Sequence, residues 1–79
     1  MEYKINWDSK RTKHAIERMT LRGISVDEVL IAIKTGKKSY QKKTKLMEAF
    51  LRHFSVVYDE KVFKDRQIRK IYPITVKLW

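Results

Sequence analysis

This chain carries residue types that suit one kind of chemistry, the metal-free cleavage of RNA. Such cleavage needs a general base near the 2′-hydroxyl, a general acid for the leaving oxygen and cations around the phosphorane. Arg, Lys, His and Tyr side chains can supply all three. Arg52 and His53 are neighbours in an apolar stretch, and Arg69, Lys70 and Tyr72 follow later. An ordinary surface ion pair or a solvated basic face is an equally open interpretation of these residues.

Other kinds of chemistry lack their motifs. The sequence has no Walker loop, no Gly-rich dinucleotide turn, no nucleophile elbow and no metalloprotease helix. It has no Cys and only two His, so neither a thiolate site nor a His-rich zinc site can be assembled. We therefore expect no metal and no other cofactor.

The positive charge is concentrated in the second half of the chain. Residues 37–79 contain twelve Lys or Arg against four Asp or Glu, whereas residues 1–36 contain seven against five. Such a density opposes compaction by self-repulsion, and it usually serves a polyanionic partner. We expect that partner to be a nucleic acid or an acidic protein.

Several cations are candidates for an RNA-binding surface. His14 and Arg18 are spaced i and i+4 on an expected helix, so they can share one flank, although helix polarity and packing explain them as well. The other candidates are cations of the later segments: Lys42, Lys43, Lys45, Arg66 and Lys70.

The first half of the chain reads as one strand and two helices. Residues 3–7 alternate apolar and polar side chains, as a strand with one buried face does. A helix capped by Asp8, Ser9 or Thr12 should then run to about residue 22, with Gly23 as its C-terminal cap.

The second helix carries the stronger local signals. Ser25 and Glu28 form a capping box, which predicts a helix start. Lys34 suits the last turn of this helix, and Gly36 is expected to end it as a left-handed cap.

The second half reads as strands. Residues 37–45 are either an exposed edge strand or a loop. We expect a strand from residue 47 that reaches a turn at residues 59–61, and a further strand at residues 67–72. Pro73 favours a strand end or a sheet edge.

Arg52 and His53 would then be neighbours within a strand. Adjacent strand residues project to opposite faces, so only one of the two can belong to any single site. The alternation of the surrounding apolar residues does not decide which one.

The predicted fold is a single α+β domain over residues 1–79. Its elements follow in the order β-α-α-β-β-β, with a further strand possible. Two helices pack on one face of a small antiparallel sheet. The other face stays open. No apolar run approaches the roughly 20 residues of a membrane span, and the first residues are no signal peptide, so we expect a cytoplasmic protein with no membrane partner.

Short motifs carry a resemblance to known families. Residues 14–19 read His-Ala-x-x-Arg-Met, residues 22–25 read Arg-Gly-Ile-Ser, and Ile71-Tyr72-Pro73 lies near the end. The combination resembles a small domain family of uncharacterised function. The Asn6-Trp7-Asp8 opening is similar to that of BrnT-like toxins, and the overall plan resembles the RelE superfamily of type II toxin-antitoxin ribonucleases.

The resemblance implies a metal-independent endoribonuclease that cleaves messenger RNA, with the ribosome as a further partner, and that an acidic antitoxin neutralises. It also implies roles for particular residues. Arg52 and Arg69 would be phosphate-stabilising cations, Lys45 a further cation, and His53 or Tyr72 a proton-transfer group.

Two alternatives stay open. One is a non-catalytic nucleic-acid-binding module, in which residues 25–34 act as the recognition helix of a helix-turn-helix, although Asp27 and Glu28 would repel phosphate there. The other is an inactive RelE-like protein that docks an acidic partner, and a homodimer is open in each case. The catalytic hypothesis requires the cations of the later strands to converge on one open side of the fold.

Overall fold

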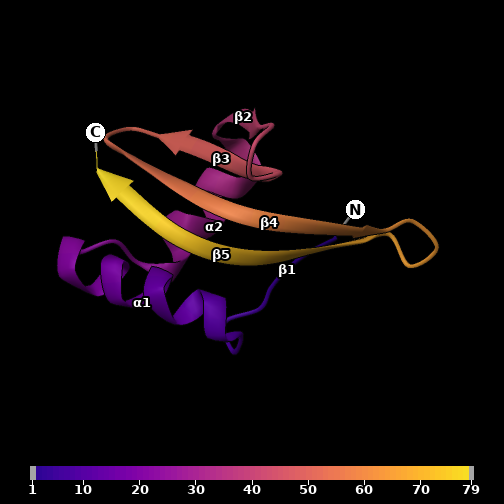
Figure 1. Ribbon diagram of the computed structural model, residues 1–79, viewed down its shortest axis with the longest axis horizontal. Helices are drawn as coiled ribbons and strands as arrows, with labels where there is room; N and C mark the ends of the chain where they lie inside the picture. The colour runs from indigo at the N-terminus through magenta and orange to yellow at the C-terminus, as the bar shows by residue number, and fades with distance from the viewer. Residues whose placement is uncertain (1, 79) are drawn as a thin grey trace.

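The computed structural model describes residues 2–78, which form two helices and a five-stranded sheet (Figure 1). The elements follow in the order β1 (Glu2–Ile5), α1 (Lys10–Arg22), α2 (Val26–Thr35), β2 (Lys37–Gln41), β3 (Leu46–Leu51), β4 (Phe54–Phe63) and β5 (Ile68–Leu78). The α+β class is confirmed.

The sheet is mixed, and this corrects the expected antiparallel sheet. Its strand order is β1-β5-β4-β3-β2, and β1 lies parallel to β5 while the other three pairs are antiparallel. Four strands follow the helices, so the order is β-α-α-β-β-β-β. The alternation in β1 predicted a strand, but alternation says nothing about the direction of its neighbour.

The helix boundaries follow local capping chemistry. Ser9 caps α1 by accepting a hydrogen bond from the Arg11 backbone N–H, and Gly23 ends it with φ +66°. Ser25 and Glu28 form both halves of the predicted capping box at the start of α2. These predictions were right because each cap depends only on residues a few positions apart.

Gly36 corrects one prediction. Its φ is −69°, so it is extended and not a left-handed cap. A Cβ at this position would lie 2.4 Å from the carbonyl oxygen of Phe50 and 2.5 Å from that of Ala32. Gly36 therefore allows the backbone of α2 to pass close to β3.

One sheet face, here called the core face, packs against α2. It presents Ala49 of β3, Val56 of β4 and Ile71 of β5, all of which are fully buried. Figure 1 shows α2 crossing behind the sheet, where it contributes its buried side chains, namely Val29, Ala32 and Ile33. The opposite side is here called the open face, because α2 does not cover it.

The other helix, α1, runs along the free edge of β5 (Figure 1). Strand β1 pairs with β5 only from Ile68 to Ile71, so the rest of β5 has no strand on that side. The Arg22 guanidinium fills part of the gap by donating from Nη1 to the Val76 carbonyl oxygen at 3.0 Å. Pro73 lies in the same unpaired stretch, so its edge position is confirmed.

The hairpin turns differ from the expectation. Arg52 and His53 form the two-residue turn between β3 and β4, and Arg52 has φ +53°. The sequence gives no Gly, Asn or Pro there, which are the usual signals of a tight hairpin turn. The prediction of both residues within a strand was wrong for this reason.

The expected turn at residues 59–61 lies in the middle of β4 instead. Strands β4 and β5 continue as a hairpin whose far end extends past both helices, and β1 pairs with β5 along this part (Figure 1). Polar side chains are tolerated in this strand because its open face meets solvent and Glu60, on the core face, is paired with Arg69. The chain turns only at residues 64–67.

The edge-strand interpretation of residues 37–45 is confirmed in part. Lys37–Gln41 forms β2 at the outer edge of the sheet, and residues 42–45 form the turn to β3. Its exposed lysines agree with the use of charge to protect an edge.

The two glycines should respond differently to alanine. Gly36→Ala places a Cβ against two backbone oxygens, so we expect a loss of about 3 kcal/mol in the free energy of unfolding. In Gly23→Ala the added Cβ meets no atom within 4 Å. Only the left-handed φ is unfavourable, and we expect it to lower the free energy of unfolding by about 1 kcal/mol. Urea denaturation of both variants checks this, and equal losses would contradict the close approach of α2 to β3.

Candidate functional site

A polar cluster occupies the core face of the sheet around the pairing of β1, β5 and β4. Tyr3 of β1 lies beside Arg69 of β5, and Tyr58 and Glu60 of β4 follow on the same face. Lys38 of β2 is opposite the buried Ala49, so it also belongs to this face. These five residues are called the Glu60 cluster.

The centre of the cluster is an ion pair across two strands. Nη1 of Arg69 donates to Oε1 of Glu60 at 2.6 Å, and the two side chains are 38% and 15% exposed. The Arg69 guanidinium also lies 5.9 Å from the centroid of the Tyr3 ring. A charge-assisted hydrogen bond in partial shelter from water holds the carboxylate in a defined place.

The charges of this pair act on two neighbouring titratable groups. Burial raises the pKa of Tyr58 to about 12, and the negative charge of Glu60 adds to the rise. Burial lowers the pKa of Lys38, an effect that Glu60 opposes and Arg69 reinforces. Perturbed groups around a fixed ion pair are typical of functional sites, although an ion pair across strands also stabilises a hairpin.

The cluster contains the groups that metal-free phosphodiester chemistry needs. Glu60 is a carboxylate that can accept a proton, and Arg69 is a permanent cation. Lys38 is a cation with a lowered pKa, which makes its ammonium a better proton donor. Its Nζ donates to the Gly36 carbonyl oxygen at 3.0 Å.

Arg52 and His53 lie at the other end of the sheet. Both are exposed in the β3–β4 turn, and the His53 ring packs edge-on against Phe54 at 5.9 Å. Phe54 is eight residues from Val62, the residue opposite Arg69, which corresponds to about 26 Å of strand. The structure therefore does not bring Arg52 and His53 together with Arg69.

The β3–β4 turn lies near the start of α2 instead. The pKa of Glu28 is lowered first by its hydrogen bond from the Ser25 backbone, and also by the charges of Arg52 and His53. The charges of this turn therefore stabilise the ionised form of the Glu28 carboxylate. The turn lies far from the Glu60 cluster.

Tyr72 and Lys70 lie on the open face. Tyr72 is opposite Asp59 and Lys70 is opposite Lys61, one residue out of phase with Glu60 and Arg69. Successive strand residues alternate between faces, so Tyr72 and Arg69 point to opposite sides. The four predicted catalytic residues therefore occupy three separate places.

The predicted RNA-binding residues are also dispersed. Lys42, Lys43 and Lys45 are exposed in the β2–β3 turn, and Arg66 is exposed at the tip of the β4–β5 hairpin. His14 and Arg18 share a flank of α1 as expected, with Arg18 Nε donating to His14 Nε2 at 3.4 Å. The expectation that the later cations converge on one side was wrong, because it rested on misplaced turns. The catalytic site expected from the sequence fails with it, so any catalytic proposal has to rest on the residues that the structure does bring together.

Sequence reasoning found Arg69 and missed its partner. Glu60 was assigned to a turn because it lies in the polar run of residues 59–61. Lys38 was one lysine in a basic segment without a clear alternation. The sequence feature that could have identified Glu60 is its spacing of two residues from Tyr58. In a strand that continues through both residues, this spacing places them on one face.

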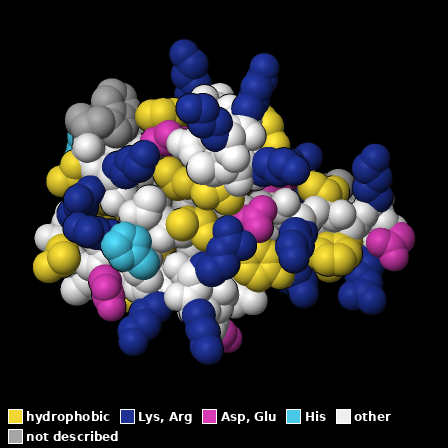
Figure 2. Space-filling model, in the orientation of Figure 1, with side chains coloured by type: hydrophobic (Ala, Val, Ile, Leu, Met, Phe, Trp, Pro, Cys, Tyr) yellow, Lys and Arg dark blue, Asp and Glu magenta, His cyan; other side chains and the backbone are white. Residues whose placement is uncertain are grey.

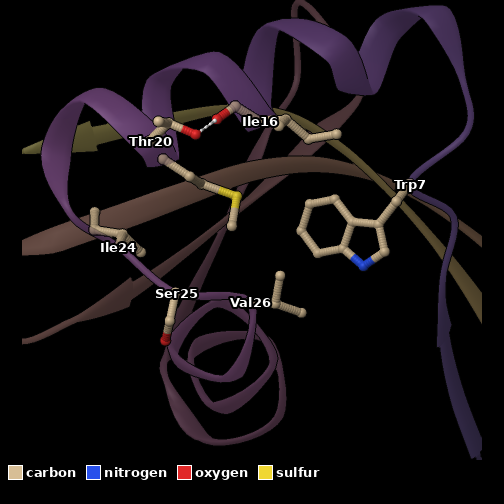
Figure 3. Close-up of a pocket in the computed structure, with 7 residues that line it drawn as sticks. Trp7, Ile16, Thr20, Ile24, Ser25 and Val26 are labelled. Atoms are coloured by element: carbon tan, nitrogen blue, oxygen red, sulfur yellow. Dashed lines mark hydrogen bonds between the residues drawn. The ribbon is translucent and has the colours of Figure 1, made fainter.

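An apolar groove lies between the two helices (Figure 3). It has a volume of about 430 Å³, and Figure 3 shows the Trp7 ring at one side of it. Its lining consists of Trp7, Ile16, Met19, Thr20, Ile24, Ser25 and Val26. None of these described lining residues titrates, so the groove offers no acid or base.

Among residues 2–78, no three His, Asp or Glu side chains are grouped so that they could hold a metal ion. No helix in this range is long and apolar enough to cross a lipid bilayer.

The chain matches one known domain family. Residues 11–62 match the family described as a domain of unknown function, DUF4258. This chain belongs to the DUF4258 family. The matched range contains Lys38, Tyr58 and Glu60, whereas Tyr3 and Arg69 lie outside it. No curated protein and no solved structure matches the chain.

The buried phenol of Tyr58 should make the protein sensitive to alkali. The folded state holds this proton more tightly than the unfolded chain, whose tyrosine pKa is near 10, so the Tyr58 contribution is intact below about pH 10. It should fall by about 2 kcal/mol as the pH rises to about 12. Comparing the unfolding free energies of wild type and Tyr58→Phe across this range isolates the effect, and parallel curves would contradict it.

Proposed function

We propose that this protein is a metal-independent endoribonuclease and that the Glu60 cluster is its active site. The observation that carries the proposal is the sheltered pair of Glu60 and Arg69 at 2.6 Å, on the same sheet face as Lys38 and Tyr58, whose pKa values respond to these charges. A carboxylate, a guanidinium and an ammonium on one strand face are the groups that this reaction uses.

The proposed reaction assigns one role to each group. Glu60 accepts the proton of the ribose 2′-hydroxyl, whose oxygen attacks the adjacent phosphorus. Arg69 stabilises the negative charge that develops on the phosphorane oxygens. Lys38 donates a proton to the 5′-oxygen as its bond to phosphorus breaks, which leaves a 2′,3′-cyclic phosphate and a 5′-hydroxyl.

The substrate and partner are proposed from charge and resemblance. The net charge of +10 favours a polyanionic substrate, and the exposed lysines of the β2–β3 turn add to its attraction. The motifs similar to those of BrnT-like toxins suggest a RelE-like fold and a cytoplasmic toxin. Its substrate would be messenger RNA, on or off the ribosome, and its neutralising partner an acidic antitoxin.

A non-catalytic RNA-binding protein is the second candidate. The dispersal of Arg52, Arg66 and the lysines of residues 42–45 over three exposed turns favours it, since binding requires no convergence on one point. The helix-turn-helix version is disfavoured, because Glu28 at the start of α2 is committed to the capping box.

Substitution in the Glu60 cluster tests the catalytic proposal. We expect expression of the wild type without a partner to arrest growth and degrade RNA. Glu60→Gln and Arg69→Ala should each lower the cleavage rate of purified protein by about 100-fold or more, since each removes a group that acts in the transition state. Gel analysis of a labelled RNA, with product ends identified, measures this.

Two further variants make the result decisive. Lys34→Ala removes an exposed cation from α2 and serves as the matched control for charge. If Arg52→Ala abolishes cleavage while Glu60→Gln does not, the site lies at the β3–β4 turn and not in the Glu60 cluster. If the wild type binds RNA without cleaving it under any condition, the non-catalytic candidate holds.

A further inference from the structure

Three lysines stand in one row across the open face of the sheet. Lys61 of β4 is directly opposite Lys70 of β5, and Lys70 is in turn opposite Lys4 of β1. Neighbouring strands are about 4.8 Å apart, so the three side chains leave adjacent positions. They are called the lysine row. Figure 2 views the sheet from the open face and shows Lys and Arg side chains between exposed hydrophobic ones.

Like charges directly opposite one another on paired strands destabilise a sheet. Within the described part of the chain, none of the three lysines forms a salt bridge. The nearby Asp59 is committed to Arg11, at 3.0 Å between Oδ2 and Nη1. The protein therefore leaves this repulsion without an internal counter-ion.

The remaining acids of this face do not neutralise the row. Glu48 accepts hydrogen bonds from the Ser55 hydroxyl at 2.6 Å and from the Gln41 amide at 3.0 Å. Glu2 is exposed on the same face, two residues before Lys4, and no salt bridge joins the two among the described residues. An external anion would relieve the repulsion between the lysines.

Aromatic rings flank the lysine row on both sides. Lys61 Nζ lies 5.6 Å from the centroid of the Tyr72 ring, and Lys70 Nζ lies 5.6 Å from that of Phe63. Tyr72 and Phe63 are four strand positions apart in register, which corresponds to about 13 Å. The order along the face is thus ring, cations, ring.

We propose that the lysine row and its two flanking rings bind single-stranded RNA. The lysines would contact successive phosphates, and bases on either side would stack on Tyr72 and Phe63. This combination of a cationic track with aromatic platforms is how proteins hold single strands without sequence preference. The choice of RNA over DNA rests on the proposed function.

The rings decide between single-stranded RNA and other polyanions. In a duplex the bases are stacked on one another, so their faces cannot reach Tyr72 or Phe63. An acidic protein would satisfy the lysines but would gain nothing specific from rings placed on both sides of them. A single strand uses both features.

The proposed surface is separate from the Glu60 cluster. Glu60 and Arg69 project from the core face of the β4–β5 hairpin, whereas Lys61 and Lys70 project from its open face. Binding at the lysine row can therefore be measured with a protein that has lost Glu60, and a failure of binding is distinguishable from a failure of cleavage.

Fluorescence anisotropy with a labelled single-stranded RNA of about 12 nucleotides tests the proposal, using full-length Glu60→Gln protein to prevent cleavage. Adding Lys4→Ala and Lys61→Ala should weaken binding at least 10-fold. The slope of log K against log salt should become shallower by about 1.4, because two phosphate contacts are lost. Adding Tyr72→Leu should weaken binding about 10-fold, whereas Tyr72→Phe should not, because phenylalanine keeps the stacking surface.

The matched control is Lys13→Ala with Lys34→Ala, which removes two exposed lysines from the helices. If this control weakens binding as much as the lysine-row variant, the attraction is diffuse and the proposal fails. The proposal also fails if duplex RNA binds as tightly as the single strand. If polyglutamate competes as well as RNA and Tyr72→Leu has no effect, the face recognises an acidic protein instead.

Discussion

The pairing of β4 with β5 is the constraint on which the other features depend. Ten cross-strand pairs hold this hairpin, which continues past both helices, and β1 pairs with β5 along Ile68–Ile71. The register alone decides that Glu60 and Arg69 share one face while Lys61 and Lys70 share the other. A slip of one residue would bring each side chain to the opposite face.

The register itself is set by the core and not by the polar residues. Ile71 and Val76 both lie in the buried core although they are an odd number of residues apart, because the sheet shifts register between Val57 and Tyr58. Such an irregularity adds one residue to a strand and restores the apolar side to the core. Burial of the core residues along the hairpin thereby fixes which polar residues share a face.

Features that depend on residues close together in the sequence could be predicted, whereas features that depend on distant strands could not. Ser9, Gly23 and the Ser25 capping box act within a few residues, so both helices were predicted with nearly correct ends. The turn at Arg52 and the parallel partner of β1 depend on distant strands, and neither left a local signal. Arg69 was found as a cation, but Glu60 was missed, because the pair exists only once β4 and β5 are aligned.

The two faces of the hairpin therefore differ in whether their cations are neutralised by a carboxylate. On the core face a carboxylate is available to Arg69, and the cation is neutralised and held in position. On the open face Asp59 is paired with Arg11 of α1, and Lys61 and Lys70 lie over aromatic rings. Cation–π contacts of this exposed kind are worth only about 0.5–1 kcal/mol each and remove no charge. Fixed charge beside a carboxylate suits acid–base chemistry, whereas unneutralised charge between rings suits the binding of a flexible polyanion.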